Sequence, residues 1–282
     1  MVDRKAGPAR RGVAIFLVLV GITSAVIEWL IIRAGGTIDK QPALVVALMW
    51  MPGLACIATR ILRREGFADV SFAFGGSRGV LAIVLAWLFP VLIGGVAYGS
   101  AWATGLAEFS PGKGVAIPSM MALYDVNFLM HIARALAIAA PLSMVLTMGE
   151  ELGWRGYLLP RLVRARVPAP ILWSGVIWGL WHVPLIVSGQ YVVSSDPRLS
   201  AAVFCASVIG GAYVFGWLRL YSGSIWPSVL GHASWNVVIQ DVFDKHTAGS
   251  SPWVGEGGVL TLVALAFFAV FLWRFGPRTS SL

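Results

Sequence analysis

The stretch VLAIVLAWLFPVLIGGVAYGSAWATGL, residues 80–106, decides the fold class. It contains no charged residue and no His, and it exceeds the roughly 20 apolar residues that a helix needs to cross about 30 Å of hydrocarbon. Similar apolar runs occur along the whole chain. They predict an all-α, polytopic transmembrane helical bundle of about eight spans, with kinks near Pro90 and Pro141 in the two longest runs. The predicted spans are 13–32, 43–62, 80–106, 128–159, 171–187, 201–221, 225–242 and 259–275.

The composition of the chain agrees with this class. Of its 282 residues, 58% are hydrophobic and 12% are charged, against about 45 to 50% and about 25% in soluble domains. A water-soluble globule is excluded, and the lipid bilayer becomes the solvent of much of the surface. We expect a single integral membrane domain, 1–282. Cys56 and Cys205 lie in apolar stretches and offer neither a disulfide framework nor a clustered zinc site.

The distribution of basic residues predicts the orientation in the membrane. A net charge of +8 would also suit a nucleic-acid binder. With eight spans, however, fifteen of the 21 Lys and Arg residues fall on the side of the termini and five on the opposite side. This asymmetry predicts that both termini are cytoplasmic, in a bacterial-type inner membrane, with no nucleic-acid partner. The first run resembles a signal peptide, but it is too long and contains Glu28, so we interpret it as a span.

Few ionisable residues lie inside the predicted spans, where each costs several kcal/mol. Glu28, His131 and Arg134 lie in outer turns, and we expect them to reach the outer interface. Glu150, His182 and His232 lie in three other spans, about 10 to 17 Å below the cytoplasmic surface at about 1.5 Å per residue. Three helices could therefore bring these side chains to one point.

Helical spacing separates two neighbouring carboxylates. Glu151 and Arg155 are four residues apart, in the order that favours an ion pair on one helix face. Glu150 is rotated by about 100° from Glu151 and remains available. His232 and Asn236 are also four apart and project from one face.

These groups are typical of two hydrolytic chemistries. Glu150, buried beside a wall formed by Trp178, is suited to accept a proton from water, and His182 could share that proton. His232 and Asn236 could then stabilise the oxyanion that forms when hydroxide attacks an amide carbonyl. A serine nucleophile is not indicated, because no GxSxG motif is present.

Zinc is the alternative cofactor for the same residues. Glu150, His182 and His232 form a His2Glu set that could hold the ion and activate its water, although HExxH is absent. The favoured mechanism needs no cofactor. A buried hydrogen-bond network without a substrate is the structural alternative.

Three motifs carry a resemblance to a known family. GEELGWRGYLLP (149–160), WGLWHVP (178–184) and HASWN (232–236) occur in this order on three apolar spans. The chain resembles the CPBP family, which joins the CAAX prenyl endopeptidases of the second type with bacterial bacteriocin-processing and immunity (Abi) proteins. The resemblance covers about 128–242, the expected catalytic core. Trp178 stands where the family usually has Phe, so the pocket shape is expected to differ.

The resemblance implies an intramembrane endopeptidase, labelled a metalloprotease or a glutamate-type protease. It implies that Glu150 activates water, His182 assists, and His232 and Asn236 stabilise the oxyanion, with Glu151 and Arg155 in support. The expected partners are membrane-associated substrates such as a CAAX-type protein, a leader peptide or a bacteriocin precursor, cleaved near the cytoplasmic side. A proton-coupled transporter and a catalytically silent immunity or scaffold protein remain alternatives, and oligomeric state does not follow from the sequence.

Overall fold

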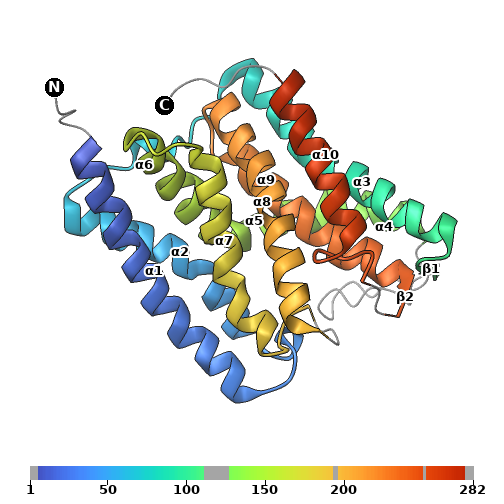
Figure 1. Ribbon diagram of the computed structural model, residues 1–282. Coiled ribbons are helices and arrows are strands. Elements are labelled where there is room, and N and C mark those ends of the chain that lie inside the picture. Colours follow the sequence, from blue (N-terminus) through green and yellow to red (C-terminus); the bar gives the residue numbers. More distant parts are fainter. Residues whose placement is uncertain (1–5, 111–126, 193–195, 250–251, 277–282) are drawn as a thin grey trace.

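The computed structural model describes residues 6–110, 127–192, 196–249 and 252–276. The predicted all-α class is confirmed: tilted helices pack side by side in one bundle (Figure 1). Two-residue strands form the only sheet among the described residues, where β1 (Glu108–Phe109) pairs antiparallel with β2 (Thr247–Ala248). The long helices are α1 (Ala6–Ala34), α2 (Pro42–Arg63), α3 (Gly76–Thr104), α7 (Pro170–Val187), α8 (Pro197–Ser222) and α10 (Val259–Phe275).

Two further predicted spans are helices of mixed winding. The fourth, predicted as 128–159, extends to Arg164 in the structure. It consists of α4 (Phe128–Arg134), the π-helical η3 (Ala135–Ala139), α5 (Ala140–Gly153), the π-helical η4 (Trp154–Leu158) and α6 (Leu159–Arg164). The seventh consists of α9 (Trp226–Trp235) and the π-helical η5 (Asn236–Phe243). Short 3-10 turns, η1 (Ile38–Lys40), η2 (Ala68–Val70) and η6 (Asp244–His246), lie in the connections.

Length and hydropathy make the protein a multi-pass membrane protein. Six of the described helices are long and apolar enough to cross a membrane, and α10 is a shorter apolar helix. Large hydrophobic side chains such as Val18, Leu88, Leu142 and Phe267 are exposed on α1, α3, α5 and α10, as expected for surfaces in lipid. The run 225–242 differs, because Pro227–Trp235 of α9 are all buried against α3, α5 and α8. This helix forms the centre of the bundle.

Local sequence explains where several helices begin and end. The Asn127 side chain accepts a hydrogen bond from the Met130 amide, and Asp196 accepts from the amides that open α8. Gly105 and Gly223 end α3 and α8 in the left-handed conformation that glycine adopts without strain. These signals fix the ends of the helices that surround the centre.

The two predicted kink sites behave differently. Pro90 lies inside α3, which is continuous from Gly76 to Thr104. Pro141 lies two residues beyond the end of the π-helical η3, and the wider winding there accommodates a residue that has no amide hydrogen to donate. The departure from regular α-helix near Pro141 therefore agrees with the prediction.

Glycine contacts bring α2 directly against α5. A Cβ atom on Gly53 would lie 2.7 Å from the carbonyl oxygen of Gly149, and one on Gly149 would lie 2.6 Å from that of Met49. Any larger side chain would force the helices apart. Because Gly149 immediately precedes Glu150, this close approach fixes the position of that carboxylate.

The ionisable residues expected at the outer interface are placed differently. Glu28 and His131 are each only 7% exposed, and the His131 ring lies 5.2 Å from the His246 ring. Both side chains therefore pack inside the protein, contrary to the expectation that they reach the membrane surface. Arg134 is half-buried. The first and last described helices begin and end at the same end of the bundle (Figure 1).

Candidate active site

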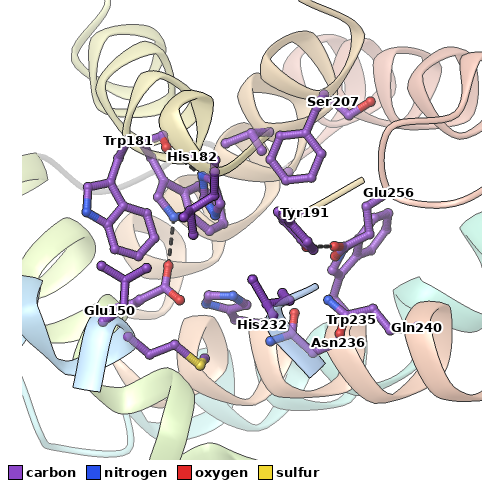
Figure 2. Close-up of a pocket in the computed structure, with 18 of the residues that line it drawn as sticks. Glu150, Trp181, His182, Tyr191, Ser207, His232, Trp235, Asn236, Gln240 and Glu256 are labelled. Atoms are coloured by element: carbon purple, nitrogen blue, oxygen red, sulfur yellow. Dashed lines mark hydrogen bonds between the residues drawn. The ribbon is translucent and has the colours of Figure 1, made fainter. Parts of the chain in front are cut away.

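A cavity of about 150 Å³ opens between α5, α7, α8 and α9. Its polar lining is shown in Figure 2, and the remaining walls are mainly apolar side chains of α2, α8 and α10. Glu150, His182, His232 and Asn236, the four predicted catalytic residues, all line this one cavity. The predicted meeting of three helices is therefore present in the fold.

Glu150 presents a buried carboxylate to the cavity. The side chain is 4% exposed, and its Oε2 accepts a hydrogen bond of 2.8 Å from the indole nitrogen of Trp178. It does not share the ion pair of Glu151, as helical spacing predicts. Among the hydrogen bonds of the described residues, none engages the other carboxylate oxygen, Oε1. One oxygen is thus held in place while the other is available to a water molecule.

Glu151 joins Arg155 and His232 in one buried cluster. Its Oε1 lies 2.8 Å from Arg155 Nη1 and 3.0 Å from His232 Nδ1. Glu151 is 0% and Arg155 1% exposed, so this ion pair is shielded from water. The Arg155 guanidinium also lies 4.2 Å from the centre of the Trp178 ring. Because Nδ1 of His232 is engaged, its Nε2 is the nitrogen left for the cavity.

His182 is positioned through its own helix. Its Nδ1 lies 2.8 Å from the carbonyl oxygen of Trp178, one turn earlier in α7. The ring contacts Trp181 and Phe204 at centroid distances of 4.8 and 5.0 Å. No hydrogen bond among the described residues joins His182 to Glu150, so Trp178 is the residue that contacts both.

Asn236 lies one turn beyond His232, where α9 changes into η5. Both side chains line the cavity, as their four-residue spacing predicts. In Figure 2 the two residues lie between Glu150 on one side and Glu256 on the other. A carbonyl group in the cavity could therefore face Glu150 while its oxygen faces His232 and Asn236.

Comparison with known families identifies this segment. Residues 128–238 match the family model of the type II CAAX prenyl endopeptidases, Rce1-like. Over this stretch, the Rce1-like segment, the chain is similar to that family. The Rce1-like segment contains all three motifs of the sequence prediction, so the predicted relationship is confirmed. Similarity to this family implies an intramembrane protease. A search of curated proteins found no match for the chain.

The Rce1-like segment holds a residue contact that sequence reasoning missed. We predicted that Glu151 supports the first motif through Arg155 alone, whereas it also accepts a hydrogen bond from His232. No pattern in the sequence gives the rotation of α9 about its axis, so this contact could not be predicted. Trp178 was expected only to form a wall of the site, but its indole N–H also donates a hydrogen bond that orients Glu150.

Four other polar residues line the cavity outside the motifs: Tyr191, Ser207, Gln240 and Glu256. Gln240 continues the four-residue spacing of His232 and Asn236, which is a visible signal in the sequence. Tyr191 and Glu256 come from connections between helices, where spacing predicts nothing about position. Their place in the cavity follows only from the fold.

The zinc alternative does not fit the arrangement. Within the part of the chain that the structure describes, no group of three His, Cys, Asp or Glu side chains could hold a metal ion. Glu150 is turned toward the indole of Trp178, and the two imidazoles are anchored on different partners. Glu150, His182 and His232 therefore do not form a ligand set in this fold.

An ion-pair cluster supports the Rce1-like segment at the end of the bundle nearest α6. Asp69 contacts Arg60 at 2.7 Å and also Arg161, while Glu65 lies 2.7 Å from Arg161. Burial alone would raise the pKa of Asp69, but hydrogen bonds from Arg161 and the charge of Arg60 outweigh it, so the pKa lies below its usual value. Buried Arg219 donates to carbonyl oxygens of η4 and of Asp69.

Proposed function

We propose that this protein is an endopeptidase that hydrolyses peptide bonds of membrane-associated substrates with water activated by Glu150. The observation that carries the proposal is the single cavity lined by Glu150, His182, His232 and Asn236. A buried, oriented carboxylate opposite a histidine and an amide provides a base and an oxyanion site at short range.

Glu150 acts on the water molecule in the first step. Its Oε1 accepts a proton from water, and the resulting hydroxide forms a bond to the carbonyl carbon of the substrate. The hydrogen bond from Trp178 to Oε2 holds the carboxylate in the orientation needed for this transfer. In the second step the C–N bond breaks, and the leaving amine takes the proton that Glu150 received.

His232 and Asn236 stabilise the oxyanion between the two steps. With Nδ1 bound to Glu151, His232 can donate from Nε2 only as the doubly protonated imidazolium, which the adjacent carboxylate favours. The side-chain amide of Asn236 supplies a second donor. His182 carries its Nδ1 proton toward a backbone carbonyl, so its Nε2 is an acceptor that can hold water or the leaving group.

The same proposal includes the orientation of the protein. The excess of Lys and Arg near the termini supports cytoplasmic ends and cleavage near the cytoplasmic side of a bacterial-type inner membrane. The boundaries of the domain, 1–282, and of the catalytic core, 128–242, remain predictions. Prenylated CAAX tails, leader peptides and bacteriocin precursors all belong to the proposed class of membrane-associated substrates.

Substitution of the base tests the function. Glu150→Gln in purified, nanodisc-embedded protein should lower the rate of cleavage of a membrane-delivered peptide by about 10²- to 10⁴-fold. His182→Ala should also abolish measurable turnover, with both variants eluting as folded protein. Glu28→Gln is the matched control, because it neutralises a similarly buried carboxylate that does not line the cavity and should retain the wild-type rate.

Retained cleavage in Glu150→Gln would refute the assignment of the base. A proton flux into proteoliposomes that depends on Glu150, without cleavage of any substrate, would instead support a transporter. Partner binding or immunity that survives the loss of Glu150 would support a scaffold.

A further inference from the structure

Glu256 is a second carboxylate in the cavity. It comes from the connection between β2 and α10, far from the three motifs in the sequence, and lines the same cavity as Glu150. Figure 2 shows the two carboxylates on opposite sides of the cavity, with His232 and Asn236 between them. The catalytic steps proposed above do not use Glu256.

Two neutral donors hold the Glu256 side chain. The hydroxyl of Tyr191 donates to Oε2, and the indole nitrogen of Trp235 donates to Oε1 over 2.6 Å. One donor on each oxygen suits an ionised carboxylate, because protonation would turn one oxygen into a donor itself. The two contacts fix the direction of the carboxylate and leave its negative charge in place.

No ion pair neutralises this charge among the described residues. None of the ion pairs that they form includes Glu256, and no Lys or Arg side chain of the described residues lines the cavity. Arg155 is paired with Glu151 and lies against the Trp178 ring. The cavity therefore carries a fixed negative charge on the side away from Glu150, enclosed by aromatic and aliphatic walls.

We propose that Glu256 is a specificity residue that binds a Lys or Arg side chain of the substrate, so that the protein favours membrane-associated peptides with a basic residue near the scissile bond. This inference rests on the proposed protease function. An ion pair with the substrate would satisfy the unpaired charge, and the aliphatic stem of Lys or Arg would pack on the rings of Tyr191 and Phe204. A free carboxylate of a substrate would be repelled on the same side.

Matched peptides test the inference directly. In a membrane-anchored reporter peptide with an amidated end, a single Lys is moved one position at a time around the cleaved bond and is compared with norleucine at each position. At one position we expect kcat/KM for wild type to be about 10- to 100-fold higher with Lys, as for a hydrogen-bonded charge pair. In Glu256→Gln that ratio should fall toward 1.

Two controls separate recognition from folding. Asp241→Asn neutralises an exposed carboxylate of η5 that pairs with Lys245 and does not line the cavity, so it should keep the wild-type ratio. The comparison of Lys with norleucine in wild type is a second control, because it does not depend on a foldable variant.

The possible outcomes are distinguishable. Equal cleavage of Lys and norleucine peptides by active wild type would overturn the role of Glu256 and leave the protease function standing. A Glu256→Gln variant that keeps the full ratio would likewise reduce Glu256 to an anchor for its loop. If wild type cleaves no peptide, or Glu150→Gln cleaves as well as wild type, the proposed function itself fails.

Discussion

Replacing Glu151 by glutamine would remove the one carboxylate that pairs with buried Arg155 among the described residues. Removing one partner of a buried ion pair costs about 3 to 5 kcal/mol, because the remaining charge is left uncompensated. The Trp178 ring 4.2 Å from the guanidinium and the new amide oxygen recover about 1 kcal/mol of this loss. We therefore expect Glu151→Gln to lower the free energy of unfolding by about 2 to 4 kcal/mol.

Chemical denaturation in mixed micelles, followed by tryptophan fluorescence, measures this loss. Glu65→Gln is the control, because Glu65 also pairs with an arginine but its side chain is 22% exposed, and the expected loss is about 1 kcal/mol or less. The double variant Glu151→Gln, Arg155→Met removes the stranded charge and should recover at least half of the loss. The reasoning would be refuted if Glu151→Gln cost no more than Glu65→Gln, or if the double variant were the less stable one.

Four further predictions follow from the site and its supports. Gly149→Ala should reduce both stability and the rate of cleavage, because its Cβ would meet the Met49 carbonyl; comparable thermal unfolding and kinetics to wild type would contradict the helix contact. Trp178→Phe keeps an aromatic ring but removes the hydrogen bond to Glu150, so kcat should fall about 10-fold, and an unchanged kcat would argue against this bond. Asp69→Asn should cost about 2 to 4 kcal/mol at pH 7. Because the pKa of Asp69 is lowered in the fold, the difference from wild type should begin to shrink below about pH 4, where the carboxyl of the unfolded chain takes up its proton, and should vanish only when the pH falls below the lowered pKa; a difference that does not shrink in acid would exclude the ion pairs as its cause. Metal chelators should leave the rate of cleavage unchanged. Loss of activity with a chelator, restored by added zinc, would disprove this prediction.

The sequence predicts the spans well because apolar runs of this length have few alternatives to a membrane helix. The predicted run 259–275 coincides with α10, and the predicted run 171–187 differs from α7 by one residue. The run 225–242 was also predicted as a span, and its helix is buried among the other helices instead of facing lipid. Hydrophobicity does not distinguish a helix surrounded by lipid from one surrounded by other helices.

The residues of the site were predictable as a set, although their contacts were not. Ionisable side chains at matched depth indicated that Glu150, His182 and His232 meet, and the cavity contains all three. Spacing within one helix also gave the Glu151 and Arg155 pair. Contacts between helices depend on how each helix is rotated about its axis, which spacing alone does not provide. The bonds from Trp178 to Glu150 and from His232 to Glu151 therefore required the fold.

Glu256 shows a further limit of prediction from the sequence. Its position in the sequence, within a connection rich in glycine, carries no periodic signal, yet the fold brings it to the cavity. The predicted positions of Glu28 and His131 were wrong for a related reason. Snorkelling was expected because both lie near helix ends, but neighbouring helices cover them.

The buried arginines constrain the order in which the protein can assemble during synthesis. Arg155 enters the bilayer together with Glu151 on the same helix, so the charge of Arg155 is already compensated when this segment leaves the translocation machinery. Arg219 has no such partner on α8 and bonds to carbonyl oxygens of η4 and Asp69, which are synthesised earlier. Stable insertion of α8 therefore requires that the preceding helices are already in the membrane next to it. A truncated chain that lacks them should leave this segment exposed to quality-control proteases.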